Sequence, residues 1–226
     1  MNKTKPYVYK RVIAYIIDLL VVTLVAGVLS LVLVNNKAYD EDVTKMNELL
    51  KDFTEEKIEE KSYLAELEDL NYSMTVHSKG VTIITFVVAL GYFGVLSYFC
   101  NGITLGKYIV KIKVASANGK KLQIWNYLLR SLIINLVLIN IVNVLLVSTL
   151  SKETFMAYYS KISNLNSIIL LVSFILIMYR DDGRGIEDFM GNTKVINIKD
   201  EIQEDTEEIK DATIISEKKN KKKEVK

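Results

Sequence analysis

The fold is decided by residues 11–34, RVIAYIIDLLVVTLVAGVLSLVLV, a run of 24 residues in which Asp18 is the only charge after the opening Arg11. A helix rises about 1.5 Å per residue, so this run can cross the apolar layer of a bilayer, which is about 30 Å thick. Lysines precede the run, as they precede a secretory signal, but the apolar core of a signal is shorter and free of acids. We therefore expect a retained membrane helix rather than a cleaved signal peptide.

Three more apolar runs follow, and none contains a charged residue: residues 81–100, 132–150 and 162–179, the last with a polar beginning. Half of the chain is hydrophobic while 25% is charged, and these runs explain that combination because they separate the two populations. Soluble core helices rarely extend this far without a charged face. We predict an all-α membrane protein with four transmembrane helices.

The charges between the runs predict the orientation. Residues 1–11 carry four basic residues and no acid, and residues 101–131 carry six basic residues and no acid. Residues 35–80 instead hold 12 acids and 6 lysines. By the positive-inside rule the two basic segments are cytoplasmic and the acidic segment lies outside. We expect a multi-pass protein of the cell membrane with both termini in the cytoplasm.

The acidic segment 35–80 is predicted to be a helical insertion outside the membrane. Between residues 40 and 70, apolar residues recur at helical spacing without an interrupting Pro or Gly. These residues are Met46, Leu49, Leu50, Phe53, Ile58, Leu64, Leu67 and Leu70. We expect one amphipathic helix, which either caps the bundle or contacts a partner in the envelope.

The cytoplasmic segment 101–124 has the pattern of a β-hairpin. Apolar residues alternate with lysines, an Asn-Gly pair supplies the turn, and apolar residues resume after it. The apolar positions are Val110, Ile112, Val114, Leu122 and Ile124, and the turn is Asn118-Gly119. Residues 194–198 are expected to add a further strand.

Composition excludes several classes of protein. The single Cys100 and the single His77 are too few for a disulfide framework, a cysteine metal cage or a histidine pair. Residues 199–226 hold 8 basic and 9 acidic residues without an aromatic, which is typical of a disordered tail. We expect no enzyme activity, no cofactor, no metal centre and no specific nucleic-acid partner.

Asp18 is the residue of the first span that needs an explanation. A carboxylate inside a span costs about 2.5–3.5 kcal/mol on insertion scales, so it needs a partner or water. Arg11 lies two helical turns away, about 10 Å along the axis, which is too far for an easy ion pair. The expected partners are a water-filled notch or groups of the third span: Arg130, Asn135, Asn140 and Asn143.

In their order along the chain, these motifs resemble the RDD family of small bacterial membrane proteins, named for an arginine and two aspartates. Arg11 and Asp18 match the first two letters, in RVIAYIID at residues 11–18. The glycine-rich family loop is matched by GITLGK at residues 102–107, through Gly102, Thr104, Gly106 and Lys107. Arg130 matches an arginine before the third span, and Asp188 matches the second aspartate.

The resemblance implies a membrane domain over residues 1–198, followed by the tail. We hypothesise in addition that Asp188 folds back under the bundle, so that Arg11, Asp18, Arg130 and Asp188 form one polar cluster facing the cytoplasm. Two features depart from the family pattern: the acidic segment 35–80 is an insertion, and Glu187 stands where a histidine often precedes the second aspartate.

Two functions follow as hypotheses. In the first, the protein transports an ion or small solute, in keeping with the cation/proton exchange proposed for some family members. Asp18 would bind a monovalent cation or proton, Arg11 would favour its ionised form, and a homo-oligomer would complete the pathway. In the second, the protein is a non-transporting assembly module of the envelope, bound to a membrane partner, with a structural Arg/Asp cluster.

Overall fold

The first apolar run forms helix α1 (Val8–Leu33). In the computed structural model, which describes residues 8–134 and 137–199, α1 buries one narrow stripe of side chains: Ala14, Asp18, Val22, Ala26 and Ser30. The rest of its surface is apolar and open, as at Leu31, which is 78% exposed. A helix that is apolar all round suits a lipid surrounding, and α1 is long and apolar enough to cross a membrane.

The second run is also a helix, Lys79–Phe99, that is long and apolar enough to cross a membrane. It consists of α4 (Lys79–Ala89), the π-helix η1 (Leu90–Leu96) and α5 (Ser97–Phe99). The wider turns of the π-helix include Gly91 and Gly94. A Cβ on Gly94 would lie 2.6 Å from the side chain of Leu128, so the glycine lets the next helix approach closely.

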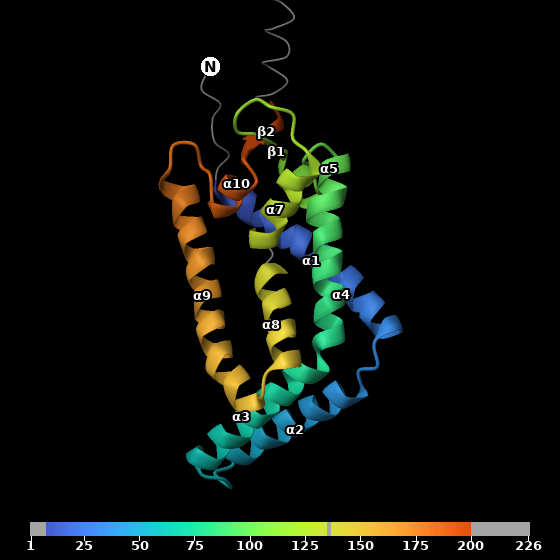
Figure 1. Ribbon diagram of the computed structural model, residues 1–226, viewed down its shortest axis with the longest axis vertical. Helices are drawn as coiled ribbons and strands as arrows, with labels where there is room; N and C mark the ends of the chain where they lie inside the picture. Colours follow the sequence, from blue (N-terminus) through green and yellow to red (C-terminus); the bar gives the residue numbers. More distant parts are fainter. Residues whose placement is uncertain (1–7, 135–136, 200–226) are drawn as a thin grey trace, which may run out of the picture.

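The third predicted span is divided between two helices. These are α7 (Ile124–Ile134) and α8 (Val137–Thr149), which are bent by 64° relative to each other. Helix α7 begins before the predicted run and packs against η1 and α10 (Ile186–Met190). Its direction is therefore set by these neighbours at the upper end of the molecule in Figure 1.

The fourth predicted span lies in the second half of α9 (Lys152–Tyr179), a continuous helix of 28 residues. Its apolar section, Ser167–Tyr179, is shorter than a span. Among the described residues, two helices meet the length and composition of a span, or three if α7 and α8 count as one.

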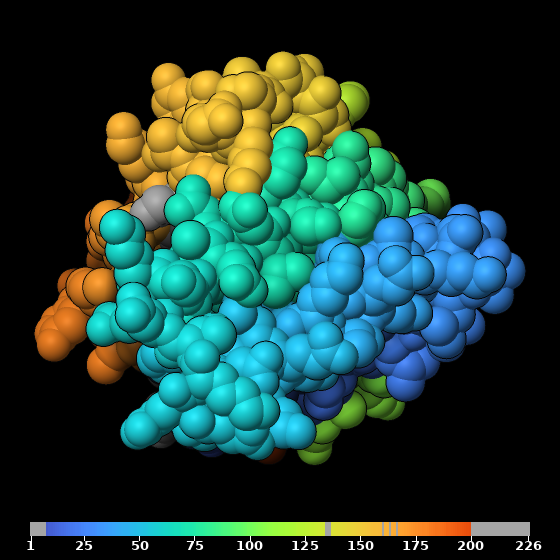
Figure 2. Space-filling model, turned by 90° about the horizontal axis from the view of Figure 1, so that it is seen from below, coloured from blue at the N-terminus to red at the C-terminus, as the bar shows by residue number. Residues whose placement is uncertain are grey.

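The acidic segment is a helical hairpin, so the prediction of one helix is wrong. Helix α2 (Lys37–Thr54) and helix α3 (Glu60–His77) turn back on each other at Glu56, whose φ is +55°. The two helices pack on each other along part of their apolar stripe, where Leu49 is buried and the rings of Phe53 and Tyr63 stack at 4.1 Å. One long helix would leave this apolar stripe open to water. The pair crosses the lower end of the molecule, as Figures 1 and 2 show.

The upper end of the molecule is a small cap with a two-stranded antiparallel sheet. Strand β1 (Ile112–Ser116) pairs with β2 (Thr193–Asn197), with Ile112 opposite Asn197. The predicted hairpin within residues 101–124 is therefore wrong, while a strand near residues 194–198 is confirmed. Ile112 and Val195 pack on Ala14 of α1, and this burial favours the distant partner over a local one. The preceding helix α6 (Leu105–Val110) completes the cap.

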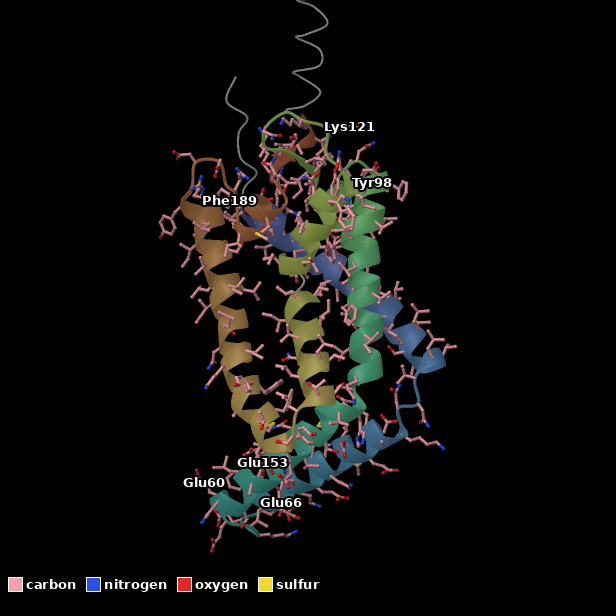
Figure 3. All side chains as sticks on the ribbon, viewed as in Figure 1. Glu60, Glu66, Tyr98, Lys121, Glu153 and Phe189 are labelled. Carbon is pink, nitrogen blue, oxygen red and sulfur yellow. The ribbon has the colours of Figure 1, made fainter. Side chains whose placement is uncertain are left out.

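Charged side chains lie mainly at the two ends. Figure 3 places Glu60, Glu66 and Glu153 at the lower end and Lys121 at the upper end. The long helices between them carry mostly apolar side chains.

Candidate functional site

Asp18 is buried, with 1% of its surface exposed, and binds the loop that precedes α6. Its Oδ1 accepts hydrogen bonds from the Tyr92 hydroxyl and from the amide of Gly106, both at 2.7 Å. Its Oδ2 accepts one from the Thr104 hydroxyl at 2.5 Å. The first amides of a helix lack partners inside that helix, so the carboxylate of α1 satisfies an orphan donor of α6. The costly charge is thereby hydrogen-bonded on both oxygens.

Gly106 is required by the closeness of this contact. A Cβ at Gly106 would clash with the carbonyl oxygen of Ala14 and lie 2.9 Å from Oδ1 of Asp18. The glycines of the matched loop therefore have a steric role. Gly102, at φ +83°, lies in the same way against the backbone of Val114.

Lys107 supplies the positive charge beside Asp18. Its Nζ donates to the Thr104 hydroxyl at 2.9 Å and lies 3.9 Å from Oδ2 of Asp18. The ammonium also lies over the ring of Phe93, 5.7 Å from its centre. Burial lowers the pKa of Lys107 to about 7, although the charge of Asp18 opposes this. The buried ammonium therefore loses its proton more easily than an exposed lysine does.

A second network surrounds Asp188, which is completely buried. Arg11 donates to its Oδ2 at 2.6 Å, and Arg130 donates to its Oδ1. The hydroxyl of Thr193 donates to Oδ1 at 3.1 Å, and the amide of Gly185 donates to Oδ2 at 3.2 Å. Asp188 thus joins α1, α7, α10 and β2 at one point.

Glu187 extends the second network. It accepts a hydrogen bond from Arg11 at 3.0 Å and another from the Ser173 hydroxyl of α9. Burial opposes ionisation, but the charges of Arg130 and Arg11 and the Ser173 hydrogen bond outweigh it and lower the pKa of Glu187. Glu187 therefore adds a buried negative charge next to Asp188.

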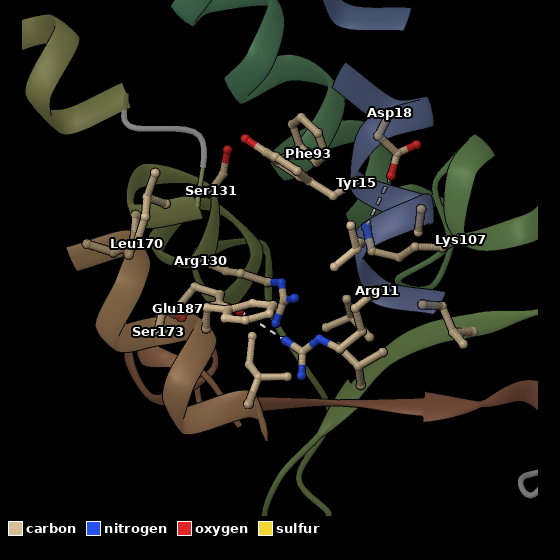
Figure 4. Close-up of a pocket in the computed structure, with 18 of the residues that line it drawn as sticks. Arg11, Tyr15, Asp18, Phe93, Lys107, Arg130, Ser131, Leu170, Ser173 and Glu187 are labelled. Carbon is tan, nitrogen blue, oxygen red and sulfur yellow. Dashed lines mark hydrogen bonds and ion pairs between the residues drawn. The ribbon is translucent and has the colours of Figure 1, made fainter. Parts of the chain in front are cut away.

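The two networks border one cavity of about 180 Å³. Figure 4 shows Asp18 and Lys107 on one side of it and Arg130, Ser173 and Glu187 on the other. Much of the remaining wall is apolar and comes from α1, β1 and α9: Val8, Val12, Ile112, Val114, Ile169, Leu170, Phe174 and Ile177.

The structure brings together three of the four residues proposed for one polar cluster. Arg11, Arg130 and Asp188 meet in one network, while Asp18 binds the 102–107 loop instead. The side chains of α1 decide this: Arg11 and Asp18 lie two turns apart, so each reaches a different segment of the cap.

The asparagines proposed to accompany Asp18 do not hydrogen-bond to it among the described residues. Asn140 and Asn143 lie on α8, where the side-chain oxygen of Asn143 is buried without a hydrogen-bond partner in the described part of the chain. Asn135 lies outside the described residues. The predicted tail also lies outside them from residue 200 onward.

Sequence reasoning missed Tyr92, Ser173 and Thr193 as members of the site. Each is a neutral hydroxyl in or near an apolar stretch, where the pattern predicts packing. Gly91 and Gly94 were the available signal for Tyr92, because they mark the π-helix that carries it.

Comparison with known proteins gives one match. A family model described as the RDD family matches residues 5–192, a range that includes both networks except for Thr193. No match was found among curated proteins or among solved structures.

Proposed function

This chain belongs to the RDD family, and we propose that it is a multi-pass protein of the cell membrane that transports an ion or a small solute. The proposal uses four spans: α1, the helix Lys79–Phe99, the bent pair α7 and α8, and α9. The first two have the length and composition of a span, and the bent pair has them if it counts as one span. Helix α9 is 28 residues long, with its apolar section at Ser167–Tyr179. The basic segments and the cap then face the cytoplasm, and the acidic hairpin of α2 and α3 lies outside.

The cavity is the observation that carries the proposal. It lies between the helices, holds about 180 Å³, and is bordered by both charged networks. Ionisable residues inside membrane proteins are expensive and commonly mark pathways for ions or substrates. A chamber with such residues on its walls provides a place where a solute can be held out of the lipid.

The π-helix supports the same proposal. Such segments occur often at functional sites, and η1 carries both Tyr92, which binds Asp18, and Phe93, which lines the cavity. A return of this segment to α-helical geometry would move both side chains. Movement of one short segment would therefore alter the cavity wall and the Asp18 contact together.

The test is flux through purified protein in liposomes, with gradients of Na⁺, K⁺, H⁺ and small organic ions applied in turn. We expect Leu170→Trp to reduce flux at least tenfold because Leu170 lines the cavity. Leu171→Trp is the matched control, since Leu171 is its neighbour on α9 and is 59% exposed. Absence of flux for every solute, or equal flux in both variants, contradicts the proposal.

A second function is favoured by the saturation of the acidic groups. Each carboxylate oxygen of Asp18, Glu187 and Asp188 accepts at least one hydrogen bond from the protein. In this version the clusters only fasten the cap to the helices, and the hairpin of α2 and α3 binds an envelope partner. Two results together would support this second function. The protein would transport no solute, and replacing residues 37–77 by a short linker would abolish binding of a partner with a basic surface.

A further inference from the structure

The charges that face the cavity are unequal. Its wall includes three cationic side chains, Arg11, Lys107 and Arg130, and two anionic ones, Asp18 and Glu187. The remaining acid of the networks, Asp188, is completely buried behind the two arginines. Because Asp188 pairs with both arginines, the two networks together hold three positive and three negative charges. Lys107 is the cation on the wall whose Nζ lies beyond hydrogen-bond distance of its carboxylate partner, Asp18.

The hydrogen-bonding capacity is unequal in the same direction. The oxygens of Asp18 already accept three hydrogen bonds, and both oxygens of Glu187 accept one. An ammonium has three N–H donors. Among the described contacts, Lys107 uses one of them on Thr104, and its distance of 3.9 Å to Asp18 exceeds a hydrogen bond. The ammonium of Lys107 therefore has unused hydrogen-bond donors, although Lys107 is only 9% exposed.

The environment of Lys107 agrees with this. Its lowered pKa arises first from burial and then from the neighbouring charges of Arg130 and Arg11, with Asp18 as the opposing charge. A second anion close to the ammonium would favour the charged form of Lys107. A cation in the same place would disfavour it.

The rest of the wall sets the shape of the occupant. Valine, isoleucine, leucine and phenylalanine side chains from α1, β1 and α9 border the space away from Lys107. The cavity of about 180 Å³ is of similar size to an engineered cavity of about 150 Å³ that binds benzene. It is too small for a whole phospholipid and suits a molecule of a few carbon atoms.

We propose that the cavity binds a small organic monoanion with a short apolar chain, such as a monocarboxylate, with its carboxylate on the ammonium of Lys107. The apolar chain lies against the side chains of α9 and α1. That this ligand is carried across the membrane rests on the proposed transport function. Binding itself does not require transport.

The experiment is calorimetric titration of the purified full-length protein in detergent. The probes are acetate, butyrate, chloride, butyramide and butylammonium. We expect butyrate to bind, acetate and chloride to bind at least tenfold more weakly, and the neutral amide and the ammonium not to bind. Preferential binding of butylammonium, or equal binding of chloride and butyrate, would overturn the proposal.

Variants locate the site. Lys107→Gln should weaken butyrate binding at least tenfold. Lys107→Arg keeps the positive charge and should retain part of the butyrate binding, which distinguishes loss of the charge from a folding defect. Lys121→Gln is the matched control, because Lys121 is an exposed lysine of the neighbouring loop. Unchanged binding in Lys107→Gln would overturn the assignment.

Liposome flux separates the two proposals. Binding of butyrate without flux of any solute would remove the transport function and leave the binding site in place. Flux of an inorganic ion without any binding of the carboxylates would do the reverse.

Discussion

Nη2 of Arg11 and Oδ2 of Asp188 lie 2.6 Å apart, although the two residues are 177 positions apart in the chain. The contact joins the beginning of α1 to α10, and both side chains are almost completely buried. Because Arg11 lies on α1 and Asp188 lies in the cap, the ion pair holds the cap against the first helix.

The Arg11–Asp188 pair should be strongly coupled. Asp188→Asn leaves two buried guanidinium groups without their shared carboxylate, and we expect a loss of about 3–5 kcal/mol in the free energy of unfolding. Arg11→Gln combined with Asp188→Asn should depart from additivity by more than 0.5 kcal/mol. Denaturant titration of the four proteins in detergent measures this.

The control for this cycle combines Arg11→Gln with Asp42→Asn. Asp42 lies in the hairpin of α2 and α3, at the other end of the molecule. These two changes should add within about 0.5 kcal/mol. Strict additivity of the first pair would show that Arg11 and Asp188 act independently.

Gly106→Ala should disturb the packing of α6 on α1. The added Cβ meets the Ala14 carbonyl and the Asp18 carboxylate, and such overpacking typically costs about 1–3 kcal/mol. Gly27→Ala is the matched control, because nothing lies within 4 Å of a Cβ at Gly27. We expect a lower unfolding temperature for the first variant and no decrease for the second, measured by thermal unfolding in detergent.

Tyr92→Phe should loosen the loop that Asp18 holds. The change removes a hydrogen bond to a charged acceptor, worth about 1.5–3 kcal/mol, and leaves the Leu105 amide without the Tyr92 oxygen at 3.1 Å. Hydrogen exchange should accelerate across residues 101–111 and not in α9. Tyr98→Phe is the control, since the Tyr98 hydroxyl makes no hydrogen bond among the described residues. Equal exchange in both variants would contradict the role of Tyr92.

Glu187 should contribute a pH-dependent part of the stability. Its pKa is lowered in the folded protein, with the charges of Arg130 and Arg11 overcoming the effect of burial. Its contribution is therefore present above the ordinary glutamate pKa of about 4.3 and is lost as the pH falls through the lower folded value. Unfolding temperatures of Glu187→Gln should fall less steeply below about pH 5 than those of the wild type. Glu153→Gln, at an exposed position of α9, should behave like the wild type.

The pattern of neighbouring residues was sufficient to predict the two long apolar helices. Residues 11–33 and 81–99 are helical because each run is predominantly apolar and contains no proline. The sequence pattern predicted the wrong pairing where two segments could cover the same apolar face. The alternation at residues 110–114 predicts a strand that begins two residues later, at Ile112, and the predicted partner is wrong because the face of β1 is completed by residues near 195.

The sequence by itself determined that this protein has apolar helices of membrane length and that its charges lie between them, because both properties depend on runs of neighbouring residues. Only the tertiary structure decided that Asp18 binds the 102–107 loop while Arg11 binds Asp188. Those choices depend on which distant segments α1 touches along its length. A buried charge accepts whichever donors the closed chain brings within about 3 Å, and no local pattern records that distance.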